Sequence, residues 1–267
     1  MALSIQPQNS VKNHFLVDKP SEGMPITLSL VCATYNAGFL LKKLIESYKA
    51  EKIPRIEFII VDAASSDNTR EIILNNSDII DKAISEPDSG IYDAWNKALK
   101  LCSGRYVAFI GADDCIAPGA LSGLVHYIEL MSSDPHVISG YSIQTRQGVP
   151  VALLGGECRP QMLWRRMMVS HILCAHKLDW LLNAGGFDIS YKSSGDYELL
   201  LRNRKHLVAE NVNFILAFVE DGGISTVSHL AFIEDYRARL NNGIHWLVCI
   251  LLLLRAVVGR TIRKWFL

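Results

Sequence analysis

Four apolar segments of strand length recur in the first half of the chain, and each one ends in a cluster of small and polar residues. They are ITLSLVC (26–32), IEFIIVD (56–62), AIS (83–85) and RYVAFIG (105–111). Runs that are apolar throughout are typical of parallel strands covered on both faces. Segments with helical spacing of apolar residues separate these runs. The sequence therefore predicts an α/β fold of Rossmann-like type, with a mostly parallel sheet flanked by helices.

Composition narrows the class of function. Of the 267 residues, 49% are hydrophobic, and 27 basic residues balance 27 acidic ones. Nucleic acid is not an expected partner, because phosphate contacts need a basic surplus. The six cysteines form no C-x-x-C pair, which argues against a zinc finger and fits a reducing compartment. The N-terminal residues lack the pattern of a secretory signal, so we expect a cytoplasmic protein.

The chain divides into three predicted parts. Residues 1–24 are polar and unpatterned, so we expect a flexible N-terminal arm. Residues 25–227 form the predicted α/β domain, with a regular half at 25–115 and a less regular half at 116–227. The segment 228–267 is a predicted helical tail.

The tail has the composition of an amphipathic helix that associates with membranes. It is uncharged from Trp246 to Leu254, which is too short to span a bilayer, since a span needs roughly 20 apolar residues. Basic residues without acidic ones follow from Arg255 to Lys264, and aromatic residues lie at both ends. This pattern predicts a helix lying in a membrane interface. The alternative is a helix packed on the domain or on a second copy of the chain.

Polar side chains follow each of the four predicted strands. In an open parallel sheet, ligands bind beyond the carboxyl ends of the strands, so these side chains should meet along one edge. The cluster is rich in carboxylates and hydroxyls and poor in cations, which suits a divalent metal that in turn holds a diphosphate. Asp113 and Asp114 are the candidate ligands for Mg²⁺ or Mn²⁺. The alternative is that one of them only caps the following helix.

Five segments in order carry a family resemblance: VCATYNAGFLLKKLIESY, IIVDAASSDNT, SEPDSGIYDAWNKAL, FIGADD and GGFDISYKSSGDYELLLR. Together they resemble family 2 glycosyltransferases of the GT-A fold, of the bacterial kind that build exopolysaccharide or O-antigen repeat units. The similarity covers about Ile26 to Ser225. It implies that residues 25–115 are the nucleotide-sugar-binding half and residues 116–227 the acceptor-binding half.

The resemblance assigns roles on the nucleotide side. Asp62 would contact the base, and the pair Asp113 and Asp114 would match the metal motif, for Mn or Mg. The residues implied to bind the nucleotide-sugar are Thr34, Tyr35, Asn36, Asp62, Glu86, Asp88, Asp93, Asn96 and Asp113. The family often reads Val-Asp-Asp-Gly-Ser where this chain has VDAAS, so Ala63 removes a polar contact. Cys115 also stands where the family often has an acidic or polar residue.

On the acceptor side, Asp196 matches the catalytic base, which would take the proton of the attacking hydroxyl. Its alternative role is a helix N-cap. Gly186 and Asp188 in GGFD match the loop that borders the acceptor. His171 is placed on the acceptor or diphosphate side, with a structural histidine as the alternative. Arg202 is expected on a solvated helix face.

The resemblance implies an inverting transferase that moves a sugar from a UDP- or GDP-sugar to a lipid-linked or oligosaccharide acceptor in cell-surface polysaccharide synthesis. The enzyme would work in the cytoplasm, peripheral on the inner face of the cell membrane. One alternative is a nucleotidyltransferase or a hydrolase-like Mg²⁺-dependent enzyme on a similar sheet. Another is a non-catalytic module that binds nucleotide or glycan.

Overall fold

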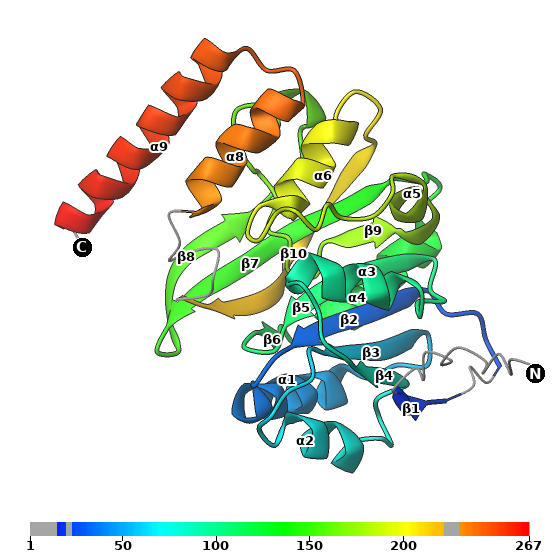
Figure 1. The fold of residues 1–267 in the computed structure, drawn as a ribbon. Coiled ribbons are helices and arrows are strands. Elements are labelled where there is room, and N and C mark those ends of the chain that lie inside the picture. The colour runs from blue at the N-terminus through cyan, green and yellow to red at the C-terminus, as the bar shows by residue number, and fades with distance from the viewer. Residues whose placement is uncertain (1–14, 20–22, 222–229, 267) are drawn as a thin grey trace, which may run out of the picture.

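The computed structural model describes residues 15–19, 23–221 and 230–266. Its centre is a twisted sheet with strand order β1-β4-β3-β2-β5-β9-β7-β10-β6, and β8 pairs with β7 (Figure 1). The four predicted strands are present as β2 (Leu28–Thr34), β3 (Ile56–Asp62), β4 (Lys82–Ser85) and β5 (Tyr106–Gly111). They are mutually parallel, and nearly all their residues are buried. The predicted α/β class is therefore confirmed.

The pairing register aligns the carboxyl ends of these four strands. Thr34 pairs with Asp62, Asp62 pairs with Ser85, and Ala33 pairs with Gly111. Because the strands run in the same direction and end at the same level, their terminal loops leave the sheet at one edge.

The second half of the sheet mixes strand directions. It contains β6 (Cys115–Ile116), β7 (Val137–Arg146), β8 (Val149–Gly155), β9 (Ala175–Lys177) and β10 (Ala209–Glu220). Strands β7 and β10 are parallel, whereas β9 runs antiparallel to both β5 and β7. Strands β7 and β8 form an antiparallel hairpin. Strand β9 thus joins the regular half to the rest without interrupting the sheet.

Helices cover both faces of the sheet and create two cores. One core contains side chains from α1 (Gly38–Glu51), α2 (Thr69–Asn75) and α4 (Ala120–Leu130). The other contains side chains from α3 (Ile91–Leu99), α5 (Leu178–Asn183), α6 (Gly195–Asn203) and α8 (Leu230–Asn241). A short 3₁₀ turn, η1 (Pro160–Met162), lies between β8 and β9.

The N-terminal arm contains a strand that the sequence did not predict. Strand β1 (Phe15–Asp18) pairs antiparallel with β4, and Val17 is buried in the first core. Its four residues are too few to show a period, and their partner lies far along the chain. The expectation of a loose arm was wrong for this part, while residues 1–14 and 20–22 lie outside the described residues.

The predicted tail divides into two helices with different surroundings. Helix α8 packs on α6, and its side chains Glu234, Ala238 and Arg239 are buried. The Arg239 guanidinium donates hydrogen bonds to the carbonyl oxygens of Trp164 and Arg165. The domain therefore extends to the end of α8 rather than ending at residue 227. Only α9 (Trp246–Phe266) projects from the body as a separate helix (Figure 1).

Candidate active site

The loops after β2 and β3 are joined by hydrogen bonds. The Asn36 Oδ1 atom accepts hydrogen bonds from the backbone N–H of Ser66 (2.9 Å) and Asp67 (3.4 Å), and the Asn36 N–H donates to Ser65 Oγ. Asn36 adopts a positive φ of 47°, which asparagine tolerates better than most residues. Tyr35 is 65% exposed, whereas Thr34 is buried. Of this predicted trio, Tyr35 is therefore the exposed member, while the side chain of Asn36 shapes the loop.

Asp62 is fully buried at the end of β3. Its carboxylate accepts hydrogen bonds from the Ser65 N–H (3.0 Å), from Ser65 Oγ, and from Ser85 Oγ (2.6 Å). These bonds tie β3 to β4 and to its own loop. The expected direct contact between Asp62 and a base does not fit this burial, so Asp62 would act through the loop that it fixes.

Asp113 and Asp114 lie in the turn directly after β5. Asp113 is exposed, whereas Asp114 is 3% exposed and accepts a hydrogen bond from the Gly111 N–H (3.0 Å). A Cβ added to Gly111 would lie 2.6 Å from Asp113 Oδ1 and 2.8 Å from Asp114 Oδ2, so both oxygens point to the space above this glycine. Burial, with the Asp113 charge beside it, raises the pKa of Asp114 to about 7. A cation placed between the two carboxylates would relieve this repulsion.

Helix α3 places a cation, which the sequence reasoning missed, beside the loop after β4. Lys97 Nζ lies 3.1 Å from Glu86 Oε1 and 3.8 Å from Asp93 Oδ2. Asp93 also accepts the N–H of Ser89, and Asp88 accepts that of Gly90. Two of the predicted nucleotide-side carboxylates are thus paired with Lys97, and these side chains hold the loop that leads into α3.

Asp196 is the second residue of α6, and Ser194 is the N-cap. The side chain is partly buried, and Tyr92 Oη of α3 donates a hydrogen bond to Asp196 Oδ1 (3.0 Å). Burial raises the pKa of Asp196, although hydrogen bonds to the carboxylate oppose this. The Tyr92 ring stacks on Phe187 at 5.6 Å and meets Trp95 edge-on at 5.3 Å. The carboxylate therefore lies beside an aromatic wall.

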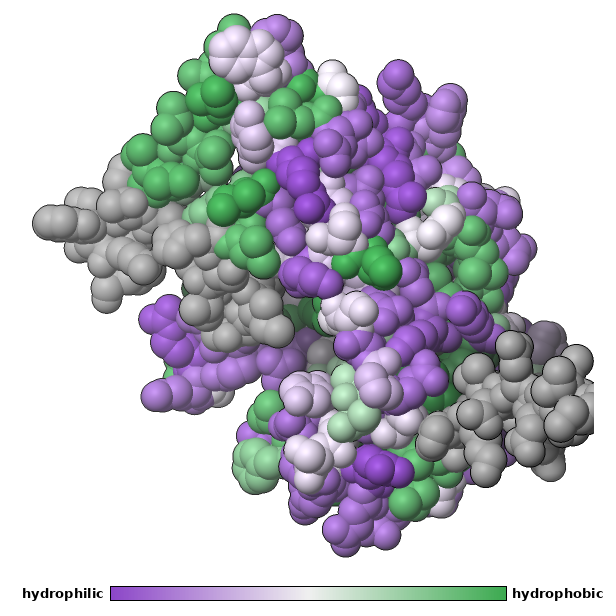
Figure 2. Space-filling model, in the orientation of Figure 1, coloured by the Kyte–Doolittle hydropathy of each residue, from purple (hydrophilic) through white to green (hydrophobic). Residues whose placement is uncertain are grey.

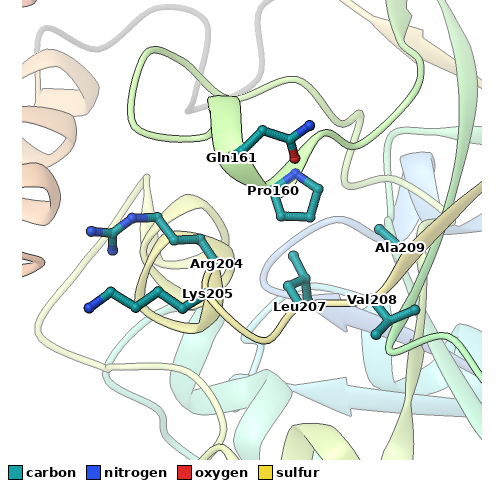
Figure 3. A pocket seen from close by; sticks show the side chains of 7 residues that line it. All are labelled: Pro160, Gln161, Arg204, Lys205, Leu207, Val208 and Ala209. Atoms are coloured by element: carbon teal, nitrogen blue, oxygen red, sulfur yellow. The ribbon is translucent and has the colours of Figure 1, made fainter.

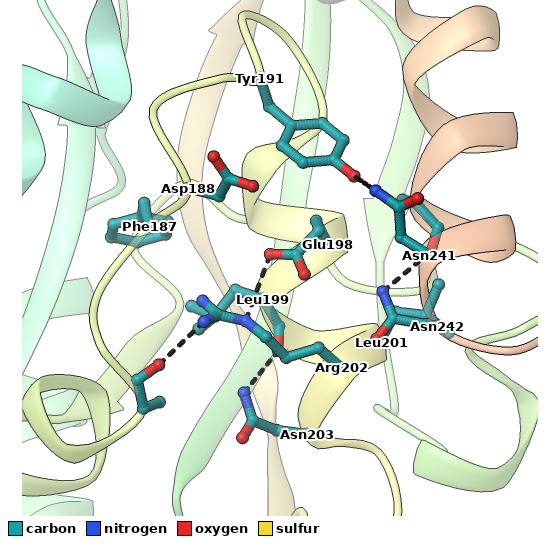
Figure 4. Close-up of polar contacts among 12 residues, drawn as sticks. Phe187, Asp188, Tyr191, Glu198, Leu199, Leu201, Arg202, Asn203, Asn241 and Asn242 are labelled. Atoms are coloured by element: carbon teal, nitrogen blue, oxygen red, sulfur yellow. Dashed lines mark hydrogen bonds and ion pairs between the residues drawn. The ribbon is translucent and has the colours of Figure 1, made fainter.

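The GGFD loop is bound to α3 and to α6. The Asn96 side chain donates to the Phe187 carbonyl oxygen (2.8 Å) and accepts from the Phe187 N–H (2.9 Å). The side-chain amide thus pairs with this residue as the backbone of a neighbouring strand would. Arg202 donates to the carbonyl oxygens of Ala184 and Gly186. It also pairs with Glu198 at 3.2 Å (Figure 4). The expectation that Arg202 lies on a solvated face was wrong. The side-chain amide of Asn96, which the resemblance assigned to nucleotide-sugar binding, is bonded to this loop.

His171 is buried against His176. Their Nε2 atoms lie 3.0 Å apart, and the His171 ring stacks on Trp95 at 5.0 Å. Burial lowers the pKa of His171 to about 3, so this residue is neutral near pH 7. A neutral imidazole cannot neutralise a diphosphate. The geometry fits a structural histidine under the aromatic wall, which was the alternative reading.

The predicted site lies apart from a cavity near the C-terminal end of α6. That cavity, of about 610 Å³, is lined by Pro160, Gln161, Arg204, Lys205, Leu207, Val208 and Ala209 (Figure 3). It lies beyond the last residue of α6, about 12 Å along the helix axis from Asp196. None of the predicted site residues lines it, so the cavity is separate from the predicted chemistry.

Comparison with known proteins agrees with this geometry. Residues 29–155 match the family model described as glycosyl transferase family 2. The match, together with the relatives and solved structures below, supports a family 2 glycosyltransferase. The matched segment contains the four aligned strand ends, whereas Asp196 and the GGFD loop lie outside it.

Two curated relatives of this chain are named as bacterial glycosyltransferases. Over 128 residues it is 34% identical to TuaG of Bacillus subtilis, a putative teichuronic acid biosynthesis glycosyltransferase, which covers 46% of this chain and 50% of the relative. Over 104 residues it is 34% identical to WfaP of Escherichia coli, a UDP-Glc:alpha-D-GlcNAc-diphosphoundecaprenol beta-1,3-glucosyltransferase, covering 38% and 41%. The matches thus span half or less of each relative.

Solved structures confirm the GT-A fold. TarS of Staphylococcus aureus in complex with UDP-GlcNAc matches with a TM-score of 0.68 and 17% identity, over 85% of this chain and 70% of that one. The mannosyltransferase PcManGT of Pyrobaculum calidifontis, in complex with GDP-Man and Mn²⁺, matches with a TM-score of 0.58 and 17% identity, over 93% and 79%. At these identities the likeness concerns the fold.

The two glycines of the GGFD loop provide a matched test of its anchoring. Both have positive φ, 82° at Gly185 and 67° at Gly186. A Cβ at Gly185 would meet open space, whereas one at Gly186 would lie 2.5 Å from Asn96 Oδ1. We expect both alanine variants to be destabilised by about 1 kcal/mol through backbone strain, and Gly186→Ala by roughly 1–3 kcal/mol more. Urea unfolding measures the difference, and equal midpoints for the two variants would contradict the Asn96 contact.

Proposed function

We propose that the chain transfers a sugar from a nucleoside-diphosphate sugar to a hydroxyl of a lipid-linked or oligosaccharide acceptor in bacterial cell-surface polysaccharide synthesis. The observation that carries the proposal is the pair of carboxylates converging above Gly111 at the edge where four strand ends align. The names of TuaG and WfaP support the polysaccharide role and a diphosphate-linked lipid acceptor. The ligands of TarS and PcManGT support a UDP- or GDP-sugar donor.

The donor set fits a divalent cation that is shared with the substrate. Among the described residues, no group of three or more His, Cys, Asp or Glu side chains is arranged to hold a metal alone. Mg²⁺ sites often combine one or two carboxylates with substrate phosphates, which is what Asp113 and Asp114 offer. A bound cation would stabilise the negative charge of the departing diphosphate. Gly111 is needed because any side chain there would fill the space between the two carboxylates.

Asp196 is the proposed general base. A sugar hydroxyl is a poor nucleophile, and a carboxylate whose pKa is raised by burial accepts its proton more readily. The hydrogen bond from Tyr92 fixes the orientation of this carboxylate. Direct attack by the acceptor on the face opposite the departing diphosphate inverts the anomeric configuration. Phe187 and the aromatic wall beside Asp196 would shield the reacting groups from water.

Replacing Asp196 by Asn tests the base. We expect Asp196→Asn to keep donor affinity within about twofold and to lose roughly 10²–10⁴ in kcat, because the amide cannot accept the proton. Asp179→Asn is a matched control, since Asp179 is the exposed second residue of α5. Formation of a glycosidic bond with an acceptor panel is the readout, because donor hydrolysis alone would not separate a transferase from a hydrolase. Turnover by Asp196→Asn equal to that of the control would remove Asp196 from this role.

We also propose that α9 rests on the inner face of the cell membrane. Leu247, Leu251, Leu254 and Val258 follow helical spacing and are each about half exposed or more. Figure 2 shows hydrophobic residues gathered along this helix. Within the described residues, no helix is both long and apolar enough to cross a membrane. An amphipathic helix with basic residues toward its end suits binding in the interface of an anionic bilayer.

Binding to lipid vesicles tests this helix. The combined change Leu247→Glu, Leu251→Glu and Leu254→Glu should abolish binding to anionic vesicles, because it places charge in the apolar contact. The same triple change at Leu74, Leu130 and Leu182, which are equally exposed on other helices, should leave binding unchanged. Equal binding by both triple variants, or no binding by the unaltered protein, would contradict the proposal.

A further inference from the structure

Glu234 of α8 is a buried carboxylate directed at the start of α6. The side chain is 4% exposed. Its Oε1 atom accepts a hydrogen bond from the Lys192 N–H (2.7 Å), and Oε2 accepts from the N–H groups of Ser193 (2.8 Å) and Ser194 (2.9 Å). Glu234 thus binds three consecutive backbone amides that immediately precede the helix bearing Asp196.

These contacts replace an ordinary local cap. The N-cap Ser194 makes no side-chain capping bond to its own helix, so the positive end of α6 faces a carboxylate from another helix. Hydrogen bonds to an ionised acceptor are stronger than neutral ones. Three of them on consecutive residues fix the path and rotation of the chain as it enters α6. Asp196 lies two residues after the last of these amides, so its position depends on where they are held.

We propose that Glu234 is a positioning residue for Asp196, which holds the catalytic carboxylate at the correct place and sets its charge environment. This inference rests on the proposed role of Asp196 as the base. Displacing a catalytic carboxylate by about 1 Å can lower the rate on the order of 10²-fold. Losing the three hydrogen bonds that hold the chain next to Asp196 should therefore lower kcat. Donor binding, which we assign to the carboxyl ends of β2, β3, β4 and β5, would be spared.

The charges around Asp196 come from three elements. Tyr92 of α3 donates to its carboxylate, and Glu234 and Asp235 of α8 lie close enough for their charges to interact with it. The buried thiol of Cys174 interacts with it also. Burial is the main cause of the raised pKa of Asp196, and the charge of Glu234 raises it further. Removing that charge should therefore lower the pKa of Asp196.

The alternative is that Glu234 only stabilises the fold. Glu57 offers a matched control, because it is 3% exposed and also accepts three hydrogen bonds, from Ser29 Oγ, the Ser103 N–H and Lys82 Nζ. It lies near the start of β3, whereas the site lies beyond the end of this strand. A purely structural carboxylate such as Glu57 should affect stability without altering the pH dependence of turnover.

The test compares Glu234→Gln, Glu234→Asp and Glu57→Gln in the full chain, using pH profiles of kcat and the donor KM. We expect Glu234→Gln to lower kcat by roughly 10–10²-fold with the donor KM within about twofold. Activity rises as Asp196 loses its proton, so a lower pKa should move the acid limb of the profile to lower pH. Glu234→Asp keeps the charge and should keep the wild-type limb with a smaller loss of kcat. Glu57→Gln should keep both kcat and the limb.

Folded Glu234→Gln with unchanged kcat, or with a loss of kcat but an unmoved limb, would overturn the inference. Should Glu234→Gln fail to fold, Glu234→Asp decides: a reduced kcat at unchanged KM supports the inference, and a wild-type kcat overturns it. The double variant Asp196→Asn with Glu234→Gln should be no slower than Asp196→Asn alone. Full activity of Asp196→Asn alone would instead refute the proposed base, which is a separate failure.

Discussion

The in-register parallel pairing of β4, β3, β2 and β5 is the constraint on which the site depends. Their largely apolar sequences require cover on both faces, and their common direction brings four carboxyl ends to one edge. The cost of this arrangement is a crowd of acidic side chains with few cations. Contacts within the protein stabilise some of these carboxylates: serine hydroxyls donate hydrogen bonds to Asp62, and Lys97 pairs with Glu86. The oxygens of Asp113 and Asp114 converge above Gly111, which suits a cation brought with the substrate.

The acceptor side is built on a different physical basis. Asp196 is held from outside its own helix, by Tyr92 of α3 and by the amides that Glu234 of α8 binds. Helix α8 also secures the loop at Trp164 through the buried Arg239. The same helix leads into α9, so the element that positions the proposed base adjoins the element that we propose rests on the membrane.

The sequence predicted what depends on local pattern and missed what depends on long-range pairing. Continuous apolar runs identified the strands, and the pair Asp113 and Asp114 followed from its place after one of them. The role of Glu234 depends on backbone amides some 40 residues earlier in the chain. A single acidic residue in a helical segment does not indicate which distant amides it will bind. Arg202 was misplaced because its partners are carbonyl oxygens, which leave no trace in sequence. The sequence could not decide between the two roles considered for His171, because its burial against His176 follows only from the fold.

The most direct test of the central claim is an anomalous difference map from crystals of the protein grown with Mn²⁺ and UDP, and separately with Mn²⁺ and GDP. The account predicts that one of the two nucleotides binds at the carboxyl edge of β2, β3 and β5. It also predicts a single manganese peak that bridges the diphosphate to Asp113 or Asp114. A nucleotide bound there without manganese, or manganese held away from both carboxylates, would contradict it.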